Sequence, residues 1–237
     1  MRSDELEPYY RARAPEYEQI YYRDIPDQRA ELEAEAGRLQ GLVTGKRVLD
    51  LACGTGYWTE VMAGSAAGIT AVDISAEMLC EAAKKTYACP VRFVQGSLLD
   101  VPEDGGRYDV VTLGFWFSHQ PRQEYDHLYD VITASLQPDG LAWLLDNSPP
   151  AEKSEADVVR VDEHGNSYKR RWLRDGREFV IIKNYFTRVQ LEAAFSDRFD
   201  IRRLVYGRYY WSAVVGPREK GPAGSAGRPE TVPDGAR

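Results

Sequence analysis

Hydrophobic and polar residues alternate along the middle of the chain in a pattern typical of α/β proteins. The short apolar and β-branched runs that predict buried strands lie at 47–51, 69–74, 91–94, 108–113 and 141–145. Stretches with helical spacing follow most of them; Ser75 is placed to cap one such stretch and Pro121 to open another. Strands that alternate with helices of this length predict right-handed crossovers and a mostly parallel sheet.

The pattern differs at the two ends of the chain. Residues 4–42 are expected to be helical, with an aromatic face, a break at Pro26 and a new helix capped by Asp27. After residue 147, the Arg174-Asp175-Gly176 turn predicts a β-hairpin. A short helix and two closing strands then follow up to 215, and the Gly- and Pro-rich residues 216–237 are expected to form a disordered tail.

Composition narrows the function classes. The chain has 237 residues, with 37 acidic residues against 30 Lys and Arg, which gives a formal net charge of −7. This balance argues against a protein that coats nucleic acid or an anionic membrane, since both require a basic surface. No apolar run approaches the roughly 20 residues that span a bilayer, and the polar N-terminus does not resemble a signal peptide. We therefore expect a cytoplasmic protein.

The cysteines give no sign of a metal or disulfide site, whereas the glycines indicate a ligand-binding turn. Cys53, Cys80 and Cys89 are too few and too irregularly spaced for a disulfide framework or a zinc site, so no metal is expected. The segment VLDLACGTGYWT, residues 48–59, instead reads as a strand, a tight Gly54-Thr55-Gly56 turn and the start of a helix. Glycines allow the backbone to approach a ligand closely there, and an acid at the end of the second strand, Asp73, can bind a ribose diol.

A dinucleotide site is disfavoured because the third glycine of that motif is replaced by Thr59. The sequence Leu-Asp-Leu-Ala-Cys-Gly-Thr-Gly resembles motif I of class I S-adenosylmethionine (SAM) methyltransferases. The resemblance implies a Rossmann-like, seven-stranded, mostly parallel sheet with helices on both faces, which binds SAM and releases S-adenosylhomocysteine (SAH). Over residues 48–147 and the N-terminal helices, the residues that it implies for the cofactor are Tyr10, Arg13, Asp50, Ala52, Gly54, Gly56, Trp58, Asp73, Ile74, Met78, Ser97, Leu98, Gly114 and Phe115.

Three flanking segments resemble a group of actinobacterial small-molecule O-methyltransferases that includes a phosphonate O-methyltransferase. They are YYRARAPEYE (9–18), GFWFSHQP (114–121) and RRWLRDGREFVIIK (170–183). The resemblance implies one domain over 1–215, with a helical lid (1–42), a SAM-binding core (46–147) and a substrate side (148–215) that contains the hairpin. The side chains that it implies for the substrate are Tyr17, Tyr22, Trp116, His119, Arg171 and Lys183.

Two of these assignments have competing interpretations. His119 follows the fourth strand and is a candidate base or substrate ligand, but it equally suits a structural histidine at the next helix. Arg171 and Lys183 alternate with apolar residues along the hairpin and suit a clamp for a carboxylate or phosphonate, but charges are also routine on a solvated hairpin face.

The resulting hypothesis is methyl transfer from SAM to an oxygen of a small acidic or hydroxyl-bearing natural-product intermediate, by a monomer or homodimer. The alternatives are an N- or C-methyltransferase acting on a small metabolite and, more remotely, a SAM-binding protein without catalysis. A nucleic-acid methyltransferase is disfavoured, since Asn147-Ser148-Pro149-Pro150 follows the fifth strand instead of the fourth and no basic stripe accompanies it.

Overall fold

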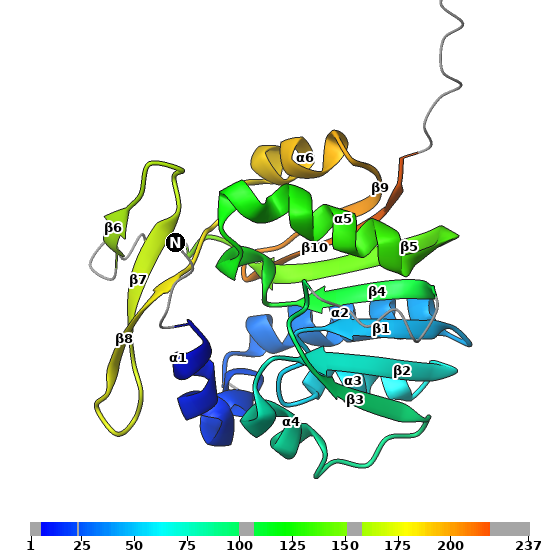
Figure 1. Ribbon diagram of the computed structural model, residues 1–237, viewed down its shortest axis with the longest axis horizontal. Coiled ribbons are helices and arrows are strands. Elements are labelled where there is room, and N and C mark those ends of the chain that lie inside the picture. Colours follow the sequence, from blue (N-terminus) through cyan, green and yellow to red (C-terminus); the bar gives the residue numbers. More distant parts are fainter. Residues whose placement is uncertain (1–5, 23, 100–106, 151–157, 219–237) are drawn as a thin grey trace, which may run out of the picture.

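The protein is built around a seven-stranded sheet (Figure 1). The structure is a computed structural model that describes residues 6–22, 24–99, 107–150 and 158–218. The strand order is β3-β2-β1-β4-β5-β10-β9, parallel from β3 to β5, with β10 antiparallel to both neighbours. The strands are β1 (Arg47–Leu51), β2 (Gly68–Asp73), β3 (Val91–Gln95), β4 (Tyr108–Gly114), β5 (Leu136–Asn147), β9 (Phe199–Tyr206) and β10 (Tyr210–Pro217). This confirms the predicted Rossmann-like, mostly parallel sheet.

Helices pack on both faces of this sheet, so its central strands are buried on both sides. One face packs against α5 and α6, through residues such as Leu128 and Phe195, and the other against α2 and α3, through Leu39 and Met62. The helices are α1 (Leu6–Arg13), α2 (Pro26–Val43), α3 (Tyr57–Ala63), α4 (Ala76–Ala82), α5 (Tyr125–Ser135) and α6 (Arg188–Ser196), with 3-10 turns η1 (Ala14–Ile20), η3 (Phe117–His119) and η4 (Arg122–Glu124). Apolar side chains that alternate between the faces of each strand produce these two cores.

Of the predicted lid, α1 and η1 lie at the carboxyl ends of the parallel strands (Figure 1), whereas α2 packs on a face of the sheet. α1 contacts β8 and α4, and η1 follows it directly. The predicted break falls before α2, but Pro26 begins that helix and Ile25 is the N-cap. The expectation that Asp27 caps it was wrong, because proline fits the first helical turn, where its missing N–H leaves no bond unmade.

The predicted hairpin is present as β7 (Ser167–Trp172) and β8 (Glu178–Ile182), and the described residues add one strand to it. β6 (Val158–Val161) pairs with β7, so the insertion after β5 is a three-stranded antiparallel sheet that projects beside α1 (Figure 1). Gly176, with φ of +86°, supplies the left-handed position in the turn between β7 and β8. This sheet places the C-terminal end of β8 next to the carboxyl edge of the large sheet.

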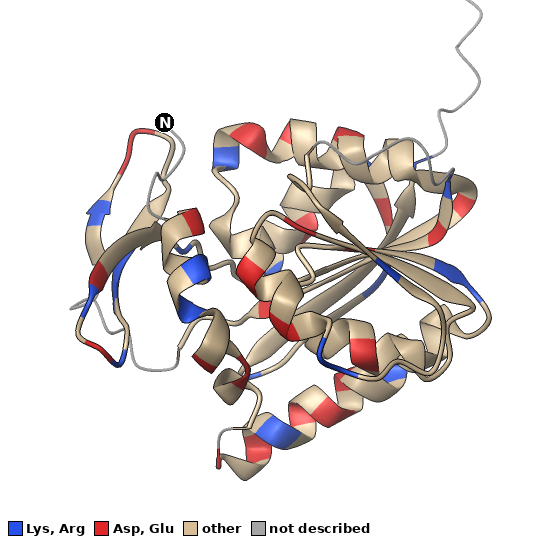
Figure 2. Cartoon of the chain, turned by 60° about the horizontal axis from the view of Figure 1, so that its bottom comes forward, with Lys and Arg blue, Asp and Glu red and all other residues tan. Residues whose placement is uncertain are grey.

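Charge is spread over the outside of the molecule. Acidic and basic residues alternate along the helices, whereas the strands of the large sheet carry few charges (Figure 2). None of the helices in the described ranges is long and apolar enough to cross a membrane. Of the predicted tail, Gly216 and Pro217 belong to β10, and residues 219–237 lie outside the described part of the chain.

Candidate active site

The loop between β1 and α3 forms the predicted tight turn. Gly54 and Gly56 both have left-handed backbones, with φ of +56° and +79°. A side chain at Gly56 would also collide with its surroundings, since a Cβ there would lie 2.5 Å from Tyr87 Oη and 3.1 Å from Ala82 Cβ. Glycine is therefore required at this position both by conformation and by space, and the loop can pass close to a ligand.

Asp73 fixes this loop from the end of β2. Its carboxylate accepts hydrogen bonds from the backbone N–H groups of Gly54, at 2.8 Å, and Ser75, at 2.9 Å. Burial raises the pKa of this carboxyl above its usual value, although the backbone donors counteract the shift. Asp73 also lines a cavity at this edge of the sheet, where its carboxylate is expected to bind a ribose diol.

Asp50 has a structural role beneath the loop. It is buried, and it accepts hydrogen bonds from the hydroxyls of Thr59, at 2.6 Å, and Thr112, at 2.9 Å. Burial raises the pKa of Asp50 to about 6. The two hydroxyl donors tie β1 to α3 and β4, and Asp50 is not among the residues that line the cavity.

A cavity of about 360 Å³ opens at the carboxyl edge of the sheet, a size suited to a small ligand. Most of the predicted site residues line it, namely Tyr10, Tyr17, Ala52, Gly54, Asp73, Ile74, Met78, Ser97, Leu98, Gly114, Phe115, Trp116 and His119. Sequence reasoning missed eight further lining residues, which are Leu6, Glu7, Ser75, Leu99, Gln120, Pro121, Glu124 and Ile182. Gln120, Pro121 and Ile182 lie within the flanking segments that the sequence analysis singled out, and Ser75 and Leu99 lie next to predicted cofactor residues, so position along the chain was the available signal.

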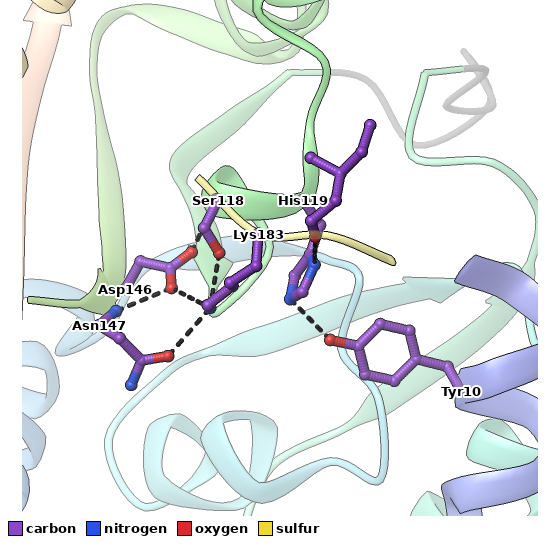
Figure 3. Close-up of polar contacts among 7 residues, drawn as sticks. Tyr10, Ser118, His119, Asp146, Asn147 and Lys183 are labelled. Atoms are coloured by element: carbon purple, nitrogen blue, oxygen red, sulfur yellow. Dashed lines mark hydrogen bonds and ion pairs between the residues drawn. The ribbon is translucent and has the colours of Figure 1, made fainter. Parts of the chain in front are cut away.

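Tyr10 and His119 meet at the wall of this cavity (Figure 3). The Nδ1 atom of His119 lies 2.5 Å from the carbonyl oxygen of Ile182, so Nδ1 carries the proton and donates it. Nε2 is then an acceptor, and the Tyr10 hydroxyl donates to it at 2.8 Å. Burial, together with the charge of Lys183, lowers the pKa of His119 to about 3, so the ring is neutral at physiological pH.

Lys183 is buried beside this pair (Figure 3). Its Nζ donates to Ser118 Oγ at 2.6 Å and to Asp146 Oδ1 and Asn147 Oδ1, both at 2.9 Å. An ammonium group has three N–H donors, so all of them are used. Asp146 is an ionised partner, because the charge of Lys183 keeps the pKa of this carboxyl low despite complete burial.

Several predicted residues lie outside the cavity wall. Arg13 is 5.5 Å from the ring centroids of both Tyr9 and Tyr17 and donates to the Tyr9 hydroxyl. Arg171 is half-buried on β7 and donates to the carbonyl oxygen of Arg170. Tyr22 is 65 % exposed. Lys183, Asp50, Gly56 and Trp58 are also absent from the wall, and the ring of Trp58 instead packs against Gly114, which tolerates no Cβ there.

Comparison with known proteins agrees with this geometry. A family model for a methyltransferase domain matches residues 48–140. Demethylmenaquinone methyltransferases of Staphylococcus aureus and Bacillus cereus are 32% identical over 114 residues and 29% identical over 122 residues. These matches cover 46% and 49% of this chain and 46% and 51% of the relatives, so the chain spans about half the length of the curated relatives that it matches.

Solved structures match over a longer stretch. DhpI in complex with SAH is 28% identical, with a TM-score of 0.74, and the match covers 92% of this chain and 98% of DhpI. The complex of DhpI with SAM and HEP is 29% identical, with a TM-score of 0.73, and its match covers 89% and 95%. The PH0226 protein from Pyrococcus horikoshii, 20% identical with a TM-score of 0.67 over 86% and 99%, shares the fold. The fold, the loop and these matches show that the chain contains a class I SAM-dependent methyltransferase domain.

Proposed function

We propose that the protein transfers a methyl group from SAM to an oxygen of a small, negatively charged acceptor. The observation that carries the proposal is the cavity, which joins the glycine loop and Asp73 on one side to Tyr10, Trp116 and His119 on the other. Its two ends therefore suit a cofactor and a second, smaller molecule. DhpI, the dehydrophos phosphonate methyltransferase, supports this assignment as a structure bound to SAM and HEP.

The residues of the cofactor half fit SAM. Ile74, Met78 and Leu98 provide apolar surface for an adenine, and the Asp73 carboxylate is placed to accept from ribose hydroxyls. Gly54 lines the wall with no Cβ, which leaves backbone accessible for the amino-acid end of the cofactor. When bound, SAM supplies a methyl group that its sulfonium already activates.

The part of the cavity proposed for the acceptor favours a negatively charged molecule, because cationic side chains lie near it, although no lysine or arginine in the described part of the chain lines the wall. Arg171 and Lys183 both lie close enough to lower the pKa of His119, and Arg13 and Arg171 lower the pKa of Lys183. Arg13 and Arg171 form no ion pair with a carboxylate in the described ranges, so Asp146 offsets one of three positive charges. The direct clamp by Arg171 and Lys183 remains a proposal for the substrate-bound protein, in which Lys183 would exchange one of its three present acceptors for an acceptor oxygen.

His119 orients the acceptor, in our proposal, and does not serve as its base. A base works best when its pKa lies near the operating pH, and the imidazole of His119 has a pKa of about 3. Its Nε2 lone pair can still accept a hydrogen bond from an acceptor hydroxyl in place of Tyr10. An oxygen that is already anionic needs no base. We propose that the protein then accelerates the reaction by aligning this oxygen with the methyl group of SAM and by excluding water with the lid.

The test is methyl transfer from SAM to a panel of small carboxylic and phosphonic acids, phenols and amines, followed by mass spectrometry and identification of the methylated atom. We expect methyl esters of acids as products. Methylation of nitrogen or carbon, with no ester, would contradict the oxygen assignment. SAM binding without transfer to any member of the panel would point to the non-catalytic alternative.

A matched pair of variants tests the charge argument. Arg171→Ala is expected to raise KM for anionic acceptors about ten-fold or more, as for loss of a charged interaction, and to leave neutral acceptors unaffected. Arg174→Ala, at the exposed turn between β7 and β8, is the control and should leave KM unchanged. Equal effects of the two substitutions would exclude a local role for Arg171.

A further inference from the structure

A second layer of residues lies behind the wall that Tyr10 and His119 form. Asp146, at the end of β5, is fully buried and contacts two separate elements (Figure 3). We propose that Asp146 is a positioning residue that holds the Lys183 ammonium and the turn carrying His119 in place for the acceptor. This inference rests on the proposed function, because it assigns Lys183 and His119 to the acceptor side.

Asp146 reaches His119 through the backbone. Its Oδ2 accepts from the N–H of Ser118 at 2.8 Å, and Ser118 precedes His119 in the η3 turn. The same turn is held from the other side, because His119 Nδ1 donates to the carbonyl oxygen of Ile182, the residue before Lys183. This hydrogen bond joins the η3 turn to the end of β8 and leaves Nε2 of His119 as a hydrogen-bond acceptor.

Asp146 also keeps Lys183 charged. Burial and the nearby charges of Arg171 and Arg13 lower the pKa of Lys183, whereas Asp146 raises it. The other groups that face Lys183 are His119, which is neutral, Asn147, Ser118 and the ring of Tyr185 at 5.9 Å from Nζ. Asp146 is therefore the single described carboxylate that pairs with this ammonium.

The geometry separates Asp146 from a residue that merely fills the core. Glu35 is a buried carboxylate with no link to the cavity: its two oxygens accept from Trp143 of β5 and from Arg38 of its own helix, on the α2 side of the sheet. Asp146 instead connects two groups at the cavity side: its Oδ2 accepts from the backbone N–H next to His119, and its Oδ1 accepts from the Lys183 ammonium, which follows β8, and from the backbone N–H of Asn147. Loss of its charge is expected to alter the chemistry at the acceptor as well as the stability.

The experiment compares Asp146→Asn with Glu35→Gln. Asp146→Asn is expected to raise the acceptor KM about ten-fold or more, with SAM affinity by calorimetry within about two-fold of the original. It should also add a falling limb to the profile of kcat/KM against pH, since Lys183 without its counter-charge loses its proton at lower pH. Glu35→Gln, which removes the charge of another buried carboxylate, on the α2 side of the sheet, should leave KM and the pH profile unchanged.

Titration of ¹³C-labelled lysine side chains by NMR, with Lys183 assigned from Lys183→Arg, measures the same effect without turnover. The proposal predicts a lower pKa for Lys183 in Asp146→Asn than in the original protein. The Lys183→Met/Asp146→Asn double variant removes both charges and should recover stability lost by either single variant while acceptor KM stays high.

An unchanged Lys183 titration in Asp146→Asn would overturn the proposal, as would equal kinetic changes in Glu35→Gln. A protein that methylates none of the acids but shows the shifted Lys183 titration would refute the proposed function and leave the holding of Lys183 by Asp146 intact. The two failures can therefore be told apart.

Discussion

At the scale of single residues, backbone strain is concentrated at the cavity. Ala52 and Phe115 have left-handed backbones, with φ of +52° and +58°, and both line the cavity wall. Such conformations cost about 1–3 kcal/mol for residues other than glycine and persist where their surroundings impose them. Phe115 is held by its backbone N–H, which donates to the carbonyl oxygen of Leu145 at 2.7 Å.

Ala52→Gly should therefore raise the free energy of unfolding by up to about 1 kcal/mol, because glycine adopts this backbone without strain. Ala71→Gly, in the neighbouring strand β2, is the matched control and should lower stability, since glycine weakens a regular strand. Urea denaturation of both variants measures the difference. A loss of stability in both would mean that Ala52 is unstrained.

His119 makes stability depend on pH. Its pKa is about 3 in the folded protein and near its ordinary value when unfolded, so the unfolded state binds the proton more readily. Stability from this group is complete above about pH 6.5 and is lost as pH falls toward 3, by up to about 1.4 kcal/mol per pH unit. His119→Asn should remove this slope in denaturation experiments, whereas His127→Asn, on the exposed side of α5, should retain it.

At the scale of elements, the lid is held by contacts from several directions. Tyr10 of α1 donates to His119, Glu18 of η1 accepts from the Thr55 hydroxyl at 3.0 Å, and Tyr21 stacks on Tyr57 with 3.8 Å between ring centroids. Glu18 also pairs with Lys85. These contacts hold α1 and η1 against the cavity, which Tyr10 and Tyr17 line.

Tyr10→Phe should loosen the lid, because it removes a half-buried hydrogen bond worth about 1 kcal/mol. Backbone amides of residues 6–20 should then exchange with solvent about five-fold faster, which hydrogen-exchange mass spectrometry measures. Tyr22→Phe, which removes the hydroxyl of an exposed tyrosine, should leave the exchange unchanged. Unchanged exchange in Tyr10→Phe would show that stacking alone holds the lid.

At the scale of the whole molecule, ligand binding and folding are coupled. The cavity wall comes from α1 and η1, from the segments that follow β1, β2, β3 and β4, and from Ile182 of β8, so a bound ligand connects segments that are far apart in the sequence. SAH at 100 times its Kd should raise the free energy of unfolding by about 2.7 kcal/mol.

Asp73→Asn should reduce this gain, because it weakens the expected ribose contact and the anchoring of Gly54. Asp139→Asn, at an exposed position in β5, should leave the gain unchanged. Thermal unfolding with and without SAH measures both. A full gain in Asp73→Asn would place the ribose elsewhere.

The order of strands and helices, the glycine turn and the placement of Asp73 followed from the sequence alone. They depend on hydrophobic periodicity and on the backbone demands of glycine, which act over a few neighbouring residues. Strand β6 of the small sheet could not be predicted from the sequence, because a short strand depends on pairing with its partner. The start of α2 at Pro26 could not be predicted either, because proline can both end and begin a helix.

Only the tertiary structure decided which groups Asp50, Lys183 and Asp146 contact. The sequence assigns Asp50 to the cofactor and Lys183 to the substrate, but folding directs Asp50 to two threonine hydroxyls and fills every donor of Lys183. Asp146 carried no motif at all. Partners that lie 37 residues apart in the chain, as Lys183 and Asp146 do, meet because sheet topology brings the ends of β5 and β8 together. Local sequence determines which backbone forms, whereas the pairing of buried charges is determined by the packing between elements.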